Sequence, residues 1–217
     1  MGFKAVLFDL DGTLLDTIGD LADSMNSVLS NLGFPLHDEE TYKYFVGEGM
    51  ENLVRRALPE SNRNDPAMVA GCLGLMREDY SHRWKARSKP YESIPELLDS
   101  LTARHKEMAI LSNKPDDLTK LMVADQFSRW KFAVVLGERP SVPRKPDPMA
   151  AVEIARRLQI QPVEFLYLGD TSIDMRTAVA AGMYGVGVLW GFRKADELIA
   201  GGAKTLLQKP MDLLELL

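Results

Sequence analysis

Two carboxylates stand two residues apart where the first apolar run of the chain meets a glycine turn, in the segment Phe8-Asp9-Leu10-Asp11-Gly12. Alternate residues of a strand point to the same side, so Asp9 and Asp11 can face one crevice, and Gly12 lets the backbone approach an anion. The two like charges repel, and a divalent cation with oxygen ligands compensates them. The segment indicates a site for phosphate and magnesium, although taken alone it also fits a solvated turn.

Further polar residues occur at the ends of later apolar runs or between them: Ser112, Lys145, Asp170 and Asp174. In an open parallel sheet the ligand crevice lies at the carboxyl ends of the strands. We therefore expect these residues to meet Asp9 and to form a single site, although they are far apart in the sequence.

Four segments together resemble the motifs of the haloacid dehalogenase superfamily of phosphohydrolases, in its phosphoglycolate-phosphatase-like branch. DLDGT at 9–13 resembles the first motif, Ser112 the second, Lys145 in RKPDP the third, and GDTSID at 169–174 the fourth. The resemblance covers nearly the whole chain. Four motifs in the family's order argue against chance agreement, whereas the lone serine or the lone lysine would be uninformative.

The resemblance implies a role for each matching residue. Asp9 would be the nucleophile that forms a covalent aspartyl-phosphate, and Asp11 would be the general acid and base. Hydroxyl, amide and ammonium groups would bind the phosphoryl oxygens, and the residues that supply them are Thr13, Ser112, Asn113 and Lys145. The presence of Asp11 weighs against a dehalogenase, because a departing halide needs no acid.

The resemblance also implies Mg²⁺ as the cofactor. Its ligands would be the carboxylates of Asp9 and Asp170 and the main-chain carbonyl of Asp11. Asp174 would bind the metal, directly or through water, or would orient the ligands. An acid favoured by the helix dipole in a first helical turn is the alternative for Asp174.

Strand-like and helical segments alternate along much of the chain, which is typical of α/β proteins. We expect a Rossmann-like, doubly wound parallel sheet. The expected strands are unbroken apolar runs: Lys4–Phe8, Met108–Leu111, Phe132–Leu136, Phe165–Leu168 and Gly185–Leu189. One helix would begin at Pro148 after an Asp147 cap, with Met149, Val152, Ala155 and Leu158 at helical spacing.

Residues 16–89 interrupt the alternation with three apolar stripes at helical spacing and no convincing strand. They resemble the family's inserted, all-helical cap domain, which leaves residues 1–15 and 90–217 as the catalytic core. Thr17 and Lys89–Pro90 would be the hinges, and Pro59–Pro66 an exposed loop.

The cap would set substrate choice. Gly47 and Gly49 belong to a segment that resembles the family's specificity loop, and Arg56 could bind a substrate carboxylate. A solvent-exposed arginine on a polar helix face is the alternative for Arg56. Lys114, Trp190 and Arg193 lie near other strand ends, and the sequence gives no reason to select any of them.

Composition narrows the function classes. The chain has 217 residues, of which 46% are hydrophobic and 26% charged, with a formal net charge of −5 and a single cysteine, Cys72. We expect a buried free thiol and no nucleic-acid partner, because no basic cluster could follow a phosphate backbone. No apolar run approaches the roughly 20 residues of a membrane helix, and no signal peptide is recognisable, so no membrane partner and a cytoplasmic location are expected.

The leading prediction is a Mg²⁺-dependent phosphatase of a small phosphorylated metabolite, with 2-phosphoglycolate as the best single guess, acting as a monomer or homodimer. A phosphatase of sugar phosphates, nucleotides or pyrophosphate is an alternative. A sugar phosphomutase similar to β-phosphoglucomutase would share all four motifs. A phosphonate hydrolase would need a Schiff-base lysine in the cap, and the surroundings of Lys43 do not resemble that motif. A non-enzymatic binding module on the same fold is the alternative from a different class.

Overall fold

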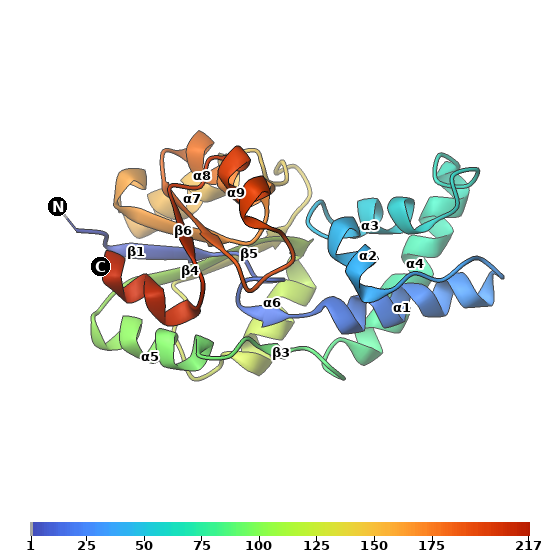
Figure 1. Ribbon diagram of the computed structural model, residues 1–217, viewed down its shortest axis with the longest axis horizontal. Helices are drawn as coiled ribbons and strands as arrows, with labels where there is room; N and C mark the ends of the chain where they lie inside the picture. Colours follow the sequence, from blue (N-terminus) through green and yellow to red (C-terminus); the bar gives the residue numbers. More distant parts are fainter. Residues whose placement is uncertain (1) are drawn as a thin grey trace. The chain divides into compact units, whose positions relative to one another are not determined.

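A parallel six-stranded sheet forms the centre of the protein in a computed structural model that describes residues 2–217 (Figure 1). Most residues of the strands are buried, as expected for strands covered on both faces. In spatial order the strands are β5 (Val134–Glu138), β4 (Glu107–Pro115), β1 (Ala5–Phe8), β6 (Phe165–Gly169), β7 (Tyr184–Val188) and β8 (Thr205–Leu207).

The sheet changes direction of winding next to its central strand. From β1 the chain proceeds to β4 and β5 on one side, then returns to place β6 on the other side of β1. Phe8 lies opposite Ile110 of β4 and Leu168 of β6 in the register of the sheet. The residues that follow these strands therefore converge at the switch point, where doubly wound sheets bind ligands.

Alternation along the strands divides the core between the two faces. Odd-numbered residues of β1, β4 and β6, such as Leu7, Ala109 and Tyr167, belong to a buried cluster with Ile154 and Ala178 of two covering helices. The helices that follow the strands cover the sheet, with α7, α8 and α9 along one face in Figure 1 and α5 and α6 along the other. Their bounds are α5 (Ile94–Ala103), α6 (Asp116–Gln126), α7 (Met149–Leu158), α8 (Ser172–Ala181) and α9 (Ala195–Gly201).

Two short 3₁₀ helices complete this part, Pro162–Glu164 before β6 and Pro210–Leu216 near the carboxyl terminus. None of the helices between residues 2 and 217 combines the length and the apolar character needed to cross a bilayer.

The described chain divides into two compact units, one of residues up to Leu15 together with Pro90–Leu217, and the other of Asp16–Lys89. The second unit contains only helices between its short end strands: α1 (Ile18–Asn31), α2 (Glu39–Phe45), α3 (Met50–Ala57) and α4 (Pro66–Arg83). The chain passes between the units through β2 (Leu15–Asp16) and β3 (Lys89–Pro90), which pair with each other.

The fold class and the five expected strands are confirmed, with ends that shift by one or two residues except at β4. β4 continues to Pro115, so Ser112, Asn113 and Lys114 all lie inside a strand. The apolar stripes of the insert are buried except at Leu32, and Cys72 is a buried free thiol, as expected. Among the elements that were not anticipated are β8, the β2–β3 pair and α2.

Helix α7 differs from the expectation by one residue at its start. The helix begins at Met149, and Asp147 caps it by accepting a hydrogen bond from the Met149 amide at 2.9 Å. Met149 and Val152 are 52% and 44% exposed, because the buried face is the neighbouring one that carries Ala151 and Ile154. The small side chains of Ala150, Ala151 and Ala155 on the buried face let the helix lie close to the sheet.

Asp20 provides a test of what holds the helical unit together. Its fully buried carboxylate accepts hydrogen bonds from the Arg87 amide at 3.0 Å and from the Ser88 amide and hydroxyl at 2.8 and 2.7 Å. Asp20→Ala leaves these donors without an acceptor, so we expect a loss of about 3 kcal/mol in the free energy of unfolding, measured with urea. Asp23→Ala removes only a partly exposed ion pair with Arg87 and should cost less than about 1 kcal/mol. Equal losses in the two variants would refute this explanation.

Candidate active site

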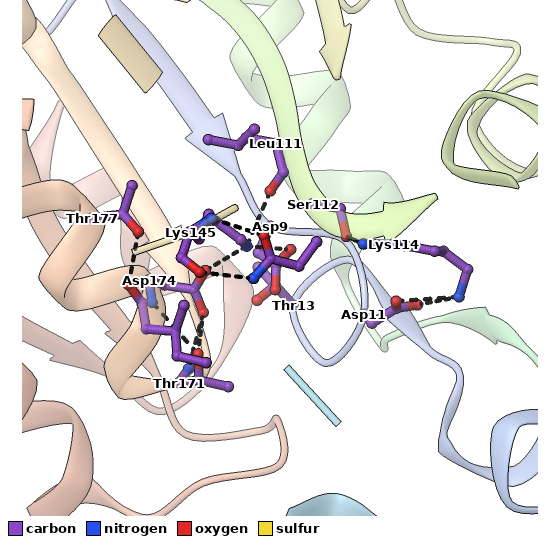
Figure 2. A network of polar contacts seen from close by, with 12 residues as sticks. Asp9, Asp11, Thr13, Leu111, Ser112, Lys114, Lys145, Thr171, Asp174 and Thr177 are labelled. Atoms are coloured by element: carbon purple, nitrogen blue, oxygen red, sulfur yellow. Dashed lines mark hydrogen bonds and ion pairs between the residues drawn. The ribbon is translucent and has the colours of Figure 1, made fainter. Parts of the chain in front are cut away.

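The predicted site residues of the sheet unit gather at the carboxyl ends of β1, β4 and β6. Asp9 follows β1 directly, Asp170 follows β6 directly, and Ser112 lies in β4. The Asp9 amide donates to the Leu168 carbonyl of β6 at 2.9 Å, which fixes the first carboxylate beside the strand that leads to the other. The convergence expected from strand topology is therefore present (Figure 2).

Lys145 lies at the centre of the charged groups. Its Nζ is 2.8 Å from Asp9 Oδ1 and 2.7 Å from Asp174 Oδ1, and it donates to the Leu111 carbonyl at 3.2 Å. Burial acts to lower the pKa of this ammonium, but the carboxylates of Asp174 and Asp9 outweigh burial and hold its pKa well above the ordinary value. Lys145 is thus a fixed positive charge.

Asn113 fixes the backbone that carries Lys145. Its side-chain amide donates to the Lys145 carbonyl at 3.0 Å, and its carbonyl oxygen accepts from the Lys145 amide at 2.9 Å. Both hydrogen bonds are buried and join residues 32 positions apart. The phosphate role expected for Asn113 stays a prediction, and its side chain serves to place the lysine.

Three buried carboxylates, those of Asp9, Asp170 and Asp174, have oxygens within 4.8 Å of one another. Burial raises the pKa of Asp9 from 3.8 to about 7, although Lys145 opposes the shift. Burial also raises the pKa of Asp170 well above its ordinary value, and the charges of Asp174 and Asp9 add to the effect. A hard divalent cation among these oxygens would relieve the repulsion, so the donor set fits the metal that the sequence predicts.

Asp174 unites the two interpretations that the sequence left open. Its Oδ2 accepts from the Thr171 amide at 3.1 Å and from the Thr171 hydroxyl at 2.7 Å, which caps helix α8, while Oδ1 binds Lys145. Gly169 is needed beneath it, because a Cβ there would collide with the Asp174 side chain. Through these contacts Asp174 helps to orient the site, and its role as a metal ligand stays a prediction.

A loop after β7 holds Asp170, and the sequence did not reveal it. The Phe192 amide donates to Asp170 Oδ2 at 2.8 Å, and the Trp190 indole donates to the Thr13 carbonyl at 3.0 Å. Gly191 lies between them, where a Cβ would collide with the Asp170 side chain and the Gly12 carbonyl. The only signal in the sequence was a glycine beside a tryptophan after an apolar strand, which is too common to single out.

The motif loop at 9–13 approaches Asp170 from the other side. The Thr13 hydroxyl donates to Asp170 Oδ1 at 3.5 Å. Gly12 has φ +85°, and a Cβ on it would collide with the Asp170 carboxylate. The close approach that requires this glycine is therefore that of a carboxylate of the same site.

Asp11 lies apart from the three carboxylates. Its oxygens are 3.0 and 3.1 Å from the Lys114 ammonium, and Figure 2 shows this pair to one side of Asp9 and Lys145. Ser112 lies between the two groups in the view, and its Oγ accepts from the Lys114 amide at 3.2 Å. Asp9 and Asp11 occupy the same end of the sheet but bind different lysines.

The predicted specificity residues belong to the helical unit. Gly47 and Gly49 adopt φ +116° and +88°, and the Glu48 carboxylate between them lies 2.6 Å from Arg56 Nη2. Arg56 also donates to the Tyr44 carbonyl at 3.1 Å. Arg56 therefore holds the glycine-containing loop, and a role in binding a substrate carboxylate stays a prediction.

The raised pKa of Asp9 predicts how stability depends on pH. A carboxyl whose pKa rises on folding binds more protons in the folded state between pH 3.8 and about 7, so stability is lost as pH rises through this window.

An asparagine at position 9 mimics the protonated acid at every pH. In EDTA we expect Asp9→Asn to raise the melting temperature at pH 8, with a gain that shrinks toward pH 5 and disappears below pH 4. Mg²⁺ should stabilise the wild type more than the variant. A wild type that melts above the variant at pH 8 in EDTA would contradict this origin of the shift.

Gly191→Ala tests the loop that holds Asp170. The added Cβ must displace the Asp170 side chain or the Gly12 carbonyl, so we expect the Kd for Mg²⁺ or Mn²⁺, measured by calorimetry, to rise roughly 10-fold or more. Gly71→Ala in α4 meets nothing within 4 Å and is the matched control, expected to leave the Kd unchanged. Unaltered metal affinity in a folded Gly191→Ala protein would show that the loop does not position this carboxylate.

Comparisons with known proteins agree with the geometry. Residues 6–188 match the model of the haloacid dehalogenase-like hydrolase family. The phosphoglycolate phosphatase of Nitrosospira multiformis is 33% identical over 199 residues, covering 90% of this chain and 87% of that protein. The phosphoglycolate phosphatase of Xylella fastidiosa is 30% identical over 208 residues, covering 95% of this chain and 90% of that protein.

A crystal structure from Lactobacillus delbrueckii subsp. bulgaricus, of a protein proposed to be a phosphoglycolate phosphatase, superposes with a TM-score of 0.91 at 28% identity, covering 99% of this chain and 98% of that one. The family match spans most of the chain, including Asp9, Lys145 and Asp170. The chain belongs to the haloacid dehalogenase-like hydrolases.

Proposed function

We propose that this protein hydrolyses a small phosphate monoester with Mg²⁺ through an aspartyl-phosphate on Asp9, and that 2-phosphoglycolate is its substrate. The observation that carries the proposal is the Asp9 carboxylate, held 2.8 Å from a buried ammonium and within a group of three carboxylates at the switch point of the sheet. The relatives named phosphoglycolate phosphatases support the choice of substrate.

Asp9 is placed to act as a nucleophile. Phosphate monoesters repel nucleophiles because their oxygens are negative, so catalysis requires a held nucleophile and positive charge around the phosphoryl group. Lys145 fixes the Asp9 carboxylate and supplies a charge that a phosphoryl oxygen can share. Attack of an Asp9 oxygen on phosphorus forms the new bond while the bond to the leaving oxygen breaks.

The metal belongs with the same carboxylates. Mg²⁺ would be held by Asp9 and Asp170 with the main-chain carbonyl of Asp11, while Asp174 orients the set through Lys145 and the Thr171 cap. When bound, the ion supplies positive charge to the phosphoryl oxygens. Asp170 is pre-oriented for this role by the Phe192 amide.

Hydroxyl groups would complete the phosphate site. The hydrogen bond that Ser112 Oγ accepts from the Lys114 amide leaves its own hydrogen without an acceptor among residues 2–217, so Ser112 can donate to a phosphoryl oxygen. The Thr13 hydroxyl already donates to Asp170, and the Asn113 side-chain amide already donates to the Lys145 carbonyl. A phosphate contact from either residue would be a further interaction.

Asp11 would carry the protons of both steps. It would donate a proton to the leaving alkoxide oxygen, and the resulting carboxylate would take a proton from the water that attacks phosphorus. That attack releases inorganic phosphate and restores the Asp9 carboxylate. In the structure the Asp11 carboxylate contacts the Lys114 ammonium at 3.0 Å.

The helical unit would act as the cap, with Gly47, Gly49 and Arg56 shaping substrate choice. A cytoplasmic location and a monomeric or homodimeric state stay predictions.

Phosphate release from a panel of phosphorylated metabolites tests the proposal. The panel contains 2-phosphoglycolate, sugar phosphates, nucleoside monophosphates and pyrophosphate, with Mg²⁺ or EDTA. We expect 2-phosphoglycolate to have the highest kcat/KM, and EDTA or Asp9→Asn to abolish release. Lys145→Met should lower kcat/KM by at least about 100-fold, because it removes a fixed charge from the phosphoryl site. Lys120→Met removes an exposed ion pair on α6 and should change nothing.

Two outcomes would contradict the proposal. Release that persists in Asp9→Asn would exclude Asp9 as the nucleophile. Phosphoryl transfer to a sugar phosphate that depends on a bisphosphate primer, with no release from any ester, would identify a mutase instead.

A further inference from the structure

A second buried lysine lies beside the site and is not explained by the reaction as described so far. The Lys114 side chain is 3% exposed, and its ammonium lies 3.0 Å from a carboxylate oxygen of Asp11, whose side chain is 11% exposed. None of the four motifs includes Lys114. A charge this deeply buried requires compensation, so its position indicates a specific partner.

The backbone of Lys114 is fixed more firmly than that of an ordinary loop residue. It belongs to β4, its amide donates to Ser112 Oγ at 3.2 Å, and its carbonyl accepts from the Thr119 hydroxyl at 3.2 Å. A Cβ on Gly137 would come within 2.7 Å of the same carbonyl, so the neighbouring strand packs closely against it. Lys114 therefore presents its ammonium from a rigid strand end.

The proposed function gives the pair a consequence. To act as the acid for the leaving oxygen, the Asp11 carboxylate must take up a proton and turn away from Lys114 toward the phosphate ester. The ammonium, which is nearly inaccessible to water, would then lose an anionic partner at 3.0 Å. An anion supplied by the substrate would restore the balance.

We propose that Lys114 is a substrate-binding residue, whose ammonium takes up a carboxylate of the substrate when the Asp11 carboxyl turns to the leaving oxygen. This inference rests on the proposed function, in which Asp11 serves that oxygen. The chemical class is a phosphate monoester with a carboxylate on the carbon that bears the ester oxygen.

The connectivity of such a substrate matches the pair. In 2-phosphoglycolate one carbon separates the leaving oxygen from the carboxylate, so the groups that serve these two sites must be neighbours. Asp11 and Lys114 are in direct contact, so a cation lies next to the group that serves the leaving oxygen.

The test compares 2-phosphoglycolate with 2-hydroxyethyl phosphate, which has the same carbon chain and a hydroxyl in place of the carboxylate. The measured quantity is the ratio of the two kcat/KM values, because any effect of a variant on Asp11 that both substrates share cancels in the ratio. The variants are Lys114→Met, Lys114→Gln, Lys114→Arg and the exposed control Lys120→Met, each checked for folding by circular dichroism.

We expect the wild type to prefer 2-phosphoglycolate and both uncharged variants to reduce the preference roughly 10- to 100-fold, the effect of losing one charged hydrogen bond. Lys114→Arg should retain most of the preference, and Lys120→Met all of it. If Lys114→Met does not fold, Lys114→Gln provides the same comparison, and Lys114→Arg must still differ from it.

A preference that survives in a folded Lys114→Met or Lys114→Gln protein would overturn the inference. So would a wild type that favours 2-hydroxyethyl phosphate. If the wild type instead hydrolyses neither ester above the Asp9→Asn background, the proposed function itself fails, and this result is distinguishable from the other two.

Discussion

The ammonium of Lys145 between the carboxylates of Asp9 and Asp174 is the interaction on which the rest of the site depends. Three buried carboxylates within 4.8 Å of one another would repel, and this lysine holds two of them in place. Burial disfavours the charged form of Asp9, and the Asp174 charge adds to the effect, so the pKa of Asp9 rises to about 7 even beside a lysine. One positive charge is not enough for the set, and the remaining imbalance is what favours a divalent cation.

The fold supplies this arrangement through the winding of the sheet. β1 and β6 are neighbours on either side of the switch point, so the residues that follow them converge without any long side chain having to reach across. Individual hydrogen bonds then fix each group. They come from the Asn113 side chain for Lys145, from Thr171 for Asp174 and from the Phe192 amide for Asp170. The site is held by buried hydrogen bonds from several elements, as a preorganised electrostatic site requires.

Most of the sheet and four of the site residues could be predicted, because the sequence features that indicate them are local. A buried parallel strand is an unbroken apolar run, so five strands were found, whereas β8 is a three-residue edge strand with no such run. The four motifs identify Asp9, Ser112, Lys145 and Asp170 by type and spacing, and topology predicts that they meet.

The features of the site that could not be predicted depend on contacts between residues far apart in the sequence. The Asp11–Lys114 pair joins residues 103 positions apart, and the bond from Phe192 to Asp170 involves a backbone amide, which every residue but proline has. Helical spacing alone did not show which stripe of α7 faces the sheet, where several alanines and Ile154 are buried.

The central claim is that Asp9 receives the phosphoryl group with Lys145 and a metal beside it. The most direct measurement is a crystal structure of the protein with Mg²⁺ and beryllium fluoride, which mimics a phosphoryl group on a carboxylate. We expect beryllium bonded to an Asp9 oxygen, Lys145 in contact with fluoride, and Mg²⁺ coordinated by Asp9 and Asp170. Beryllium fluoride bound away from Asp9, or Mg²⁺ bound outside these carboxylates, would contradict the account.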